Sequence, residues 1–307
     1  MKLTTSRFLL ASLVVLAPTA SALDPSSKLS SPIHRSGLNG GGSSFTILSV
    51  SNTNTQPSTP SDFGGTTNIQ YNYVNTIPNA ADPFLPHDCY VVDRVEQLTP
   101  GDTLAVLTNC HNAANASGWV YIEAQDPEKF KEAWDFPYLI GHVLVVNSAG
   151  GTYSINMIPD SQTESSTLAL EFLAVAGSSL NIAHFQDPTE DEFYIPKTVT
   201  LAFDIFNDNE FQLSSTRVFR CWFDQPLSVV SPVFGEDFLR NNTPNDPQEL
   251  DINCDNLGDF ETGWAKVDAI IANSQTGTEY NPYIIGAITS GPASMVDGGR
   301  VLWNCAK

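Results

Sequence analysis

The string NCHNAANASGW at residues 109–119 recurs further along the chain as NCDNLGDFETGW at residues 253–264. In both places an Asn-Cys-x-Asn sequence precedes a Gly-Trp pair. PYLIG at residues 137–141 then matches PYIIG at residues 282–286, in the same order. Shared strings in one order over this length predict that a single unit has been duplicated in tandem.

Each unit consists of short segments with the alternation that is typical of strands. NIQYNYV at residues 68–74 and VTLAFDIF at residues 199–206 both place apolar residues at every second position. Each unit holds roughly seven such segments, which is the strand number of a β-sandwich. We therefore predict an all-β chain with two tandem, internally repeated β-sandwich domains. They are expected to be immunoglobulin-like or jelly-roll-like, with short helical insertions.

Composition sets the predicted boundaries. They are a signal peptide at 1–22, a flexible Ser/Gly-rich tether at 23–44, the first sandwich at 45–160, a connection at 161–198 and the second sandwich at 199–307. In the connection, the alternation of Leu168, Leu170 and Phe172, followed by that of Leu180 and Ile182, favours a hairpin. A helix over Thr167–Ala176 is the alternative, because Leu, Ala and Glu are good helix formers.

The first residues predict export. Lys2 and Arg7 precede a short apolar run at residues 8–16, and Ala20-Ser21-Ala22 fits a signal-peptidase site. We therefore expect a secreted protein, extracellular or periplasmic, without a membrane span. The formal net charge of −20 repels nucleic-acid phosphates, so nucleic acid is not an expected partner.

Five cysteines in an exported chain predict disulfides. Pairing within each repeat gives Cys89–Cys110 and Cys221–Cys254. Cys305 is left over: it could replace Cys221 as the partner of Cys254, link two chains or remain a thiol.

Oxygen-bearing side chains recur at alternate positions after the second repeat's first strands. They are Asp251, Asn253, Asp255, Asp259 and Glu261. This spacing resembles that of calcium-binding loops, although Asn256 stands where such loops have glycine and Thr262 where they have glutamate. Calcium is therefore the one cofactor that the sequence indicates. The alternative is a solvated Asn/Asp turn beside a disulfide.

The recurring Gly-Trp pairs favour core packing, because Trp119 and Trp264 each open a strand after a polar loop. The alternative is an exposed tryptophan that stacks on a sugar ring. No catalytic residue can be named: the five histidines show no metal-ligand spacing, and no nucleophile-elbow motif is present.

These features predict a secreted, non-enzymatic protein that acts as a surface, matrix, ligand-binding or adhesion module. Its expected partner is an extracellular ligand, either carbohydrate or protein. The alternative is an extracellular hydrolase acting on carbohydrate or ester substrates, with carboxylates between the repeats. A concave cleft with facing carboxylates would favour the enzyme.

Overall fold

The structure is a computed structural model of the chain. It describes residues 24–37, 44–59, 62–77, 88–129, 132–146, 152–174, 178–185, 198–207, 211–235, 237–239, 261–272, 279–290, 297–298 and 301–303.

Strands from the first half of the chain form two antiparallel sheets, which we call the N-terminal sheet pair. The order in sheet I is β4 (Asp88–Leu98), β3 (Thr67–Ile77), β6 (Gly118–Gln125), β1 (Lys28–His34) and β9 (Ile158–Pro159). The order in sheet II is β5 (Thr103–Leu107), β2 (Phe45–Asn52), β7 (Leu139–Val146) and β8 (Thr152–Asn156). A one-turn helix, α1 (Thr108–His111), follows β5, and a 3-10 turn, η1 (Asp160–Gln162), follows β9.

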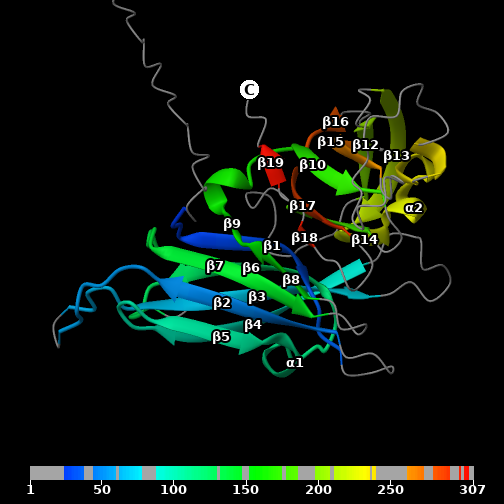
Figure 1. The fold of residues 1–307 in the computed structure, drawn as a ribbon. Coiled ribbons are helices and arrows are strands. Elements are labelled where there is room, and N and C mark those ends of the chain that lie inside the picture. Colours follow the sequence, from blue (N-terminus) through cyan, green and yellow to red (C-terminus); the bar gives the residue numbers. More distant parts are fainter. Residues whose placement is uncertain are drawn as a thin grey trace, which may run out of the picture.

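Strands from the second half form the C-terminal sheet pair. The order in sheet III is β13 (Gln212–Arg220), β12 (Thr198–Asn207), β15 (Thr262–Ala272), β10 (Thr167–Leu173) and β19 (Val301–Trp303), and β16 (Glu279–Tyr280) pairs with β15. The order in sheet IV is β14 (Trp222–Pro226), β11 (Ser179–Phe185), β17 (Tyr283–Ser290) and β18 (Asp297–Gly298). A short helix, α2 (Leu227–Val230), and a 3-10 turn, η2 (Pro232–Phe234), follow β14. Figure 1 shows the two pairs as two lobes. The predicted all-β class with short helices is confirmed.

Two clusters of buried side chains underlie the two pairs. The first joins Ile69 and Val120 of sheet I to Leu48 of sheet II. The second joins Leu201 of sheet III to Leu180 of sheet IV. The alternating residues of each strand therefore supply the buried apolar area that stabilises the fold.

The first cluster also extends into the second lobe, because Trp222 and Ile285 are among its members. The Trp222 indole donates a hydrogen bond to the carbonyl oxygen of Pro32, at 2.7 Å. Arg35 of the first lobe forms an ion pair with Asp224 of the second and lies over the Trp222 ring. The two lobes thus share a packed junction.

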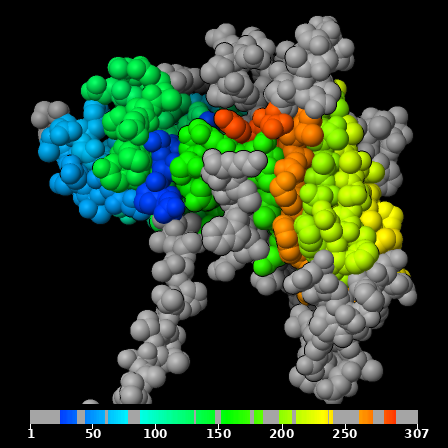
Figure 2. Space-filling view, turned by 90° about the horizontal axis from the view of Figure 1, so that it is seen from above, coloured from blue at the N-terminus to red at the C-terminus, as the bar shows by residue number. Residues whose placement is uncertain are grey.

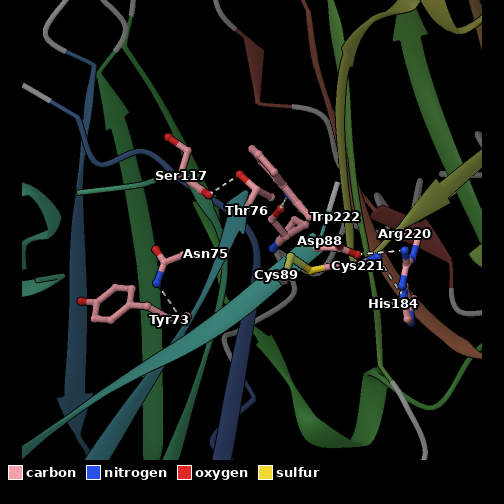
Figure 3. The surroundings of a disulfide bond; sticks show 11 residues. Tyr73, Asn75, Thr76, Asp88, Cys89, Ser117, His184, Arg220, Cys221 and Trp222 are labelled. Carbon is pink, nitrogen blue, oxygen red and sulfur yellow. Dashed lines mark hydrogen bonds and ion pairs between the residues drawn. A yellow bond between two sulfur atoms is a disulfide. The ribbon is translucent and has the colours of Figure 1, made fainter. Parts of the chain in front are cut away.

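A disulfide between Cys89 on β4 and Cys221, which follows β13, closes this junction covalently. Beside it, Arg220 forms an ion pair with Asp88 at 2.9 Å (Figure 3). The predicted Cys89–Cys110 pair is therefore wrong, and Cys110 is free and exposed. The predicted Cys221–Cys254 pair is also excluded, because Cys221 already has its partner.

The prediction kept each disulfide within one repeat, whereas the observed bond joins the two lobes. Several pairings were open to five cysteines, and only the fold decides which Cα atoms approach. Here the ends of two edge strands meet, and their Cα atoms lie 6.1 Å apart. Cys254 and Cys305 lie outside the described residues.

The tether predicted at 23–44 is wrong for Lys28–His34, which form β1 and pair with both β6 and β9. Leu29 and Ile33 enter the first buried cluster. The segment is rich in Ser and Pro, which suggested a flexible tether. Burial of Leu29 and Ile33 nevertheless outweighs the conformational entropy that is lost when the segment becomes ordered. The first sheet pair therefore begins before residue 45.

The connection predicted at 161–198 contains two strands, β10 and β11, and the alternative helix is absent over the described residues 167–174. The two strands do not form a hairpin: β10 pairs with β15 and β19, whereas β11 pairs with β14 and β17. Leu170 and Ile182 meet in the second cluster from opposite sheets. Alternation shows which side chains face a core, but it does not distinguish strands that pair from strands that pack face to face.

Candidate functional site

The outer face of sheet III exposes a stacked aromatic pair. On β15, Ala265 and Val267 face the core, so Trp264 faces outward. Phe206 on β12 lies directly opposite Trp264 in the ladder. The two ring centroids are 4.3 Å apart and the planes differ by 10°, and 41% of Trp264 is exposed. In Figure 2 the orange strip of β15 reaches the surface between green β10 and yellow-green β12 and β13.

The glycine of the recurring Gly-Trp pair has a structural role in both lobes. A Cβ atom at Gly263 would collide with the carbonyl oxygen of Phe206, and one at Gly118 would collide with that of Val74. Both glycines therefore permit close strand approach just before the tryptophan.

Polar side chains continue the row on either side of the aromatic pair. Register places Gln212 of β13 beside Phe206, and Glu171 of β10 beside Trp264. Directly paired residues on one face of a sheet have Cβ atoms about 5 Å apart. The row therefore runs Gln212, Phe206, Trp264, Glu171 across four strands. We call these four residues the aromatic row.

The neighbouring row of outward-facing residues contains one cation, Lys266, which already forms an ion pair. Lys266 lies opposite Asp204 in the ladder, and its ammonium group is 2.6 Å from Asp268 on its own strand. Gln212 donates a hydrogen bond to Asp204 at 3.4 Å. Amide, carboxylate and ammonium groups thus lie beside the apolar stacking surface of Phe206 and Trp264.

Core packing was predicted for both tryptophans, but only one of them is buried in the structure. Trp119 is 2% exposed and belongs to the first cluster, so its prediction is confirmed. For Trp264 the prediction is wrong. The alternation of VTLAFDIF already places Phe206 outward, with Val199, Leu201, Phe203 and Ile205 inward, and could have revealed the outward aromatic residue.

Four of the five predicted calcium residues, Asp251, Asn253, Asp255 and Asp259, lie outside the described residues. The fifth, Glu261, is buried just before β15, and its backbone oxygen accepts a hydrogen bond from Ala174. Within the described ranges, no group of three or more His, Cys, Asp or Glu side chains is placed to hold a metal. The calcium site stays a prediction.

A second polar array lies in the N-terminal sheet pair and was not predicted. The hydroxyl of Tyr73 is 2.7 Å from Nδ1 of His111, whose Nε2 is 3.3 Å from Glu96. Burial is the largest influence on His111 and lowers its pKa, although Glu96 opposes the shift. A neutral His111 that accepts from Tyr73 carries its proton on Nε2 and donates to Glu96.

This carboxylate–histidine–hydroxyl order resembles a catalytic relay. However, Tyr73 is fully buried, and burial raises the pKa of its hydroxyl. Its oxygen is therefore protonated and inaccessible to a substrate. The array ties α1 to the sheet and leaves the aromatic row as the stronger candidate site.

No helix in the described part of the chain combines the length and apolar character that a bilayer crossing requires. Comparisons with protein-family models, curated proteins and solved structures found no match.

Proposed function

We propose that the chain is a secreted, non-catalytic glycan-binding protein of the adhesion or matrix type, built from two copies of one β-sandwich. The support for duplication is the strand order. Sheet I, β4-β3-β6-β1-β9, corresponds position by position to sheet III, β13-β12-β15-β10-β19. Sheet II corresponds to sheet IV in the same way, and a short helix follows both β5 and β14.

The recurring strings occupy corresponding places in this scheme. Trp119 lies near the start of β6, and Trp264 lies near the start of β15. Both strands are third in their sheets. With β1, β10 and β11 included, the copies would extend over 28–159 and 167–303, and the sequence-based boundaries shift accordingly.

The single observation that carries the binding function is the exposed indole of Trp264. An aromatic ring has a negative face, which attracts the positively polarised C–H bonds on the flat side of a sugar ring. The stack on Phe206 fixes the indole before a ligand arrives, so little side-chain entropy is lost on binding. Glu171, on the side of Trp264 away from Phe206, can then accept hydrogen bonds from ring hydroxyl groups.

The alternative, a hydrolase acting on carbohydrate or ester substrates, gains no support from the His111 array because Tyr73 is inaccessible. The aromatic row lies on a sheet face and offers contact without a nucleophile. Binding is therefore the function that we favour.

The test compares two exposed aromatic residues in the chain from Leu23 onward. Binding of a panel of soluble oligosaccharides is measured by calorimetry for the wild type, Trp264→Ala, Phe206→Ala and Tyr138→Ala. Trp264→Ala should weaken binding at least tenfold, as expected for an aromatic contact at the centre of a site. Phe206→Ala should have a smaller effect, because it frees the indole to move.

Tyr138, which is 43% exposed in the other lobe, is the matched control, and its substitution should leave affinity unchanged. Thermal melting of each variant confirms that it is folded. Wild-type affinity in Trp264→Ala, or no glycan bound by the wild type, would refute the proposal.

A further inference from the structure

The two faces of the Trp264 indole have different surroundings. The row order puts Phe206 on one side of Trp264 and Glu171 on the other. Because Phe206 is stacked against the indole at 4.3 Å, one face is covered. The remaining face points along the row towards β10, where Glu171 stands. A ring that stacks on Trp264 therefore meets the Glu171 carboxylate.

Glu171 is exposed, and its carboxylate has no ion pair or hydrogen bond among the described residues. Of the described residues in the aromatic row and the row next to it, Lys266 is the only cation. Its ammonium group is occupied by Asp268. An uncompensated negative charge thus lies at the open side of the stacking surface.

We propose that the aromatic row recognises amino sugars in their protonated form, with the ring on Trp264 and the ammonium group at Glu171. This inference rests on the proposed glycan-binding function and adds the class of sugar. Cations are attracted both to the negative face of tryptophan and to a carboxylate. The two interactions act on one ligand group only when an aromatic face and a carboxylate adjoin, as they do here.

The charge of the whole chain acts in the same direction. A net charge of −20 draws cationic polymers towards the protein and repels glycans that carry uronate or sulfate groups. Beyond about 10 Å this steering is screened at 0.1 M salt, whereas the contact with Glu171 is screened less. Specificity for the ammonium group should therefore survive moderate salt.

The experiment measures dissociation constants by calorimetry for three ligands of equal length. They are a β-1,4 glucosamine oligomer at a pH where it is protonated, its neutral N-acetylated form and a uronate oligomer. The glucosamine oligomer should bind about tenfold more tightly than the neutral one, and the uronate oligomer should bind most weakly.

Glu171→Gln should weaken the glucosamine oligomer about fivefold and leave the neutral oligomer unchanged. Glu128→Gln is the matched control, because it makes the same change in net charge at an exposed site in the other lobe. It should alter neither affinity. Both substitutions are at exposed positions, and thermal melting verifies the fold.

The outcomes separate this inference from the proposed function. If Trp264→Ala abolishes binding but Glu171→Gln leaves the glucosamine affinity unchanged, amino-sugar recognition is refuted and glycan binding stands. Equal affinity of the wild type for the charged and neutral oligomers has the same meaning. If Trp264→Ala binds every oligomer like the wild type, both proposals are overturned.

Discussion

Trp119 and Trp264 each follow a glycine near the start of the third strand of their sheets, yet one is 2% exposed and the other 41%. Both glycines are required for the same reason, which is close strand approach. In the N-terminal pair the tryptophan joins the shared core beside Tyr121, whereas in the C-terminal pair it stacks on Phe206 in the open. A shared motif thus specifies a position on a strand, and the surroundings decide whether the tryptophan at that position is buried or exposed.

The largest expected effect concerns the bond that joins the two lobes. Replacing both Cys89 and Cys221 by alanine should lower the free energy of unfolding by about 3–5 kcal/mol, because the closed loop of 132 residues no longer restricts the unfolded chain. Urea unfolding should also change from one transition to two, if the lobes are separate folding units.

Cys110→Ala serves as the control, since this exposed thiol has no disulfide partner among the described residues. It should change stability by no more than about 0.5 kcal/mol. A double variant as stable as the wild type would contradict the role assigned to the junction.

The second prediction tests the tryptophans directly. Trp119→Ala should cost about 3–5 kcal/mol, because it leaves a cavity in the first cluster. Trp264→Ala should cost less than about 1 kcal/mol, since the residue is exposed and only its stack with Phe206 is lost. Chemical denaturation of both variants gives the two values, and equal costs would remove the contrast between the lobes.

The smallest effect should appear in acid and belongs to the N-terminal pair. Burial, assisted by the charge of Arg35, lowers the pKa of His34 from 6.5 to about 3. Between these two pH values the unfolded chain binds the proton more readily than the folded one. The contribution of neutral His34 to stability is therefore complete above pH 6.5 and is lost as the pH falls towards 3.

The free energy of unfolding of the wild type should fall between about pH 7 and pH 4. In His34→Leu this fall should be smaller by on the order of 3 kcal/mol. The measurement is urea unfolding at both pH values. His142→Leu, which removes an exposed imidazole from the same lobe, should retain the wild-type loss. Parallel pH profiles for the wild type and His34→Leu would show that His34 does not titrate as its burial requires.

The sequence was sufficient to predict the strands and insufficient to predict their partners. VTLAFDIF at residues 199–206 has the alternation of a half-buried strand, and β12 has it too. The partners depend on tertiary packing: β10 and β11 follow one another yet belong to different sheets, and Cys89 bonds across the lobes. Local composition was misleading at Lys28–His34, where Leu29 and Ile33 decide the structure.

The candidate site was predictable only in part. The outward position of Phe206 follows from alternation alone, and the recurring Gly-Trp pair indicates a sugar-stacking tryptophan only as the alternative to core packing. The nearness of Glu171 and Gln212 depends on ladder register across four strands, which no local pattern encodes.

The bond between Cys89 and Cys221 also determines how the chain would respond to being pulled. Tension applied at the two ends would pass through the sulfur atoms and bypass residues 90–220, which include β10 and β12. Because the disulfide closes a loop of 132 residues, about 450 Å of chain cannot be extended while the bond is intact. Glu171 on β10 and Phe206 on β12 are therefore shielded from such tension, whereas Trp264 on β15 lies beyond Cys221 and stays on the loaded path.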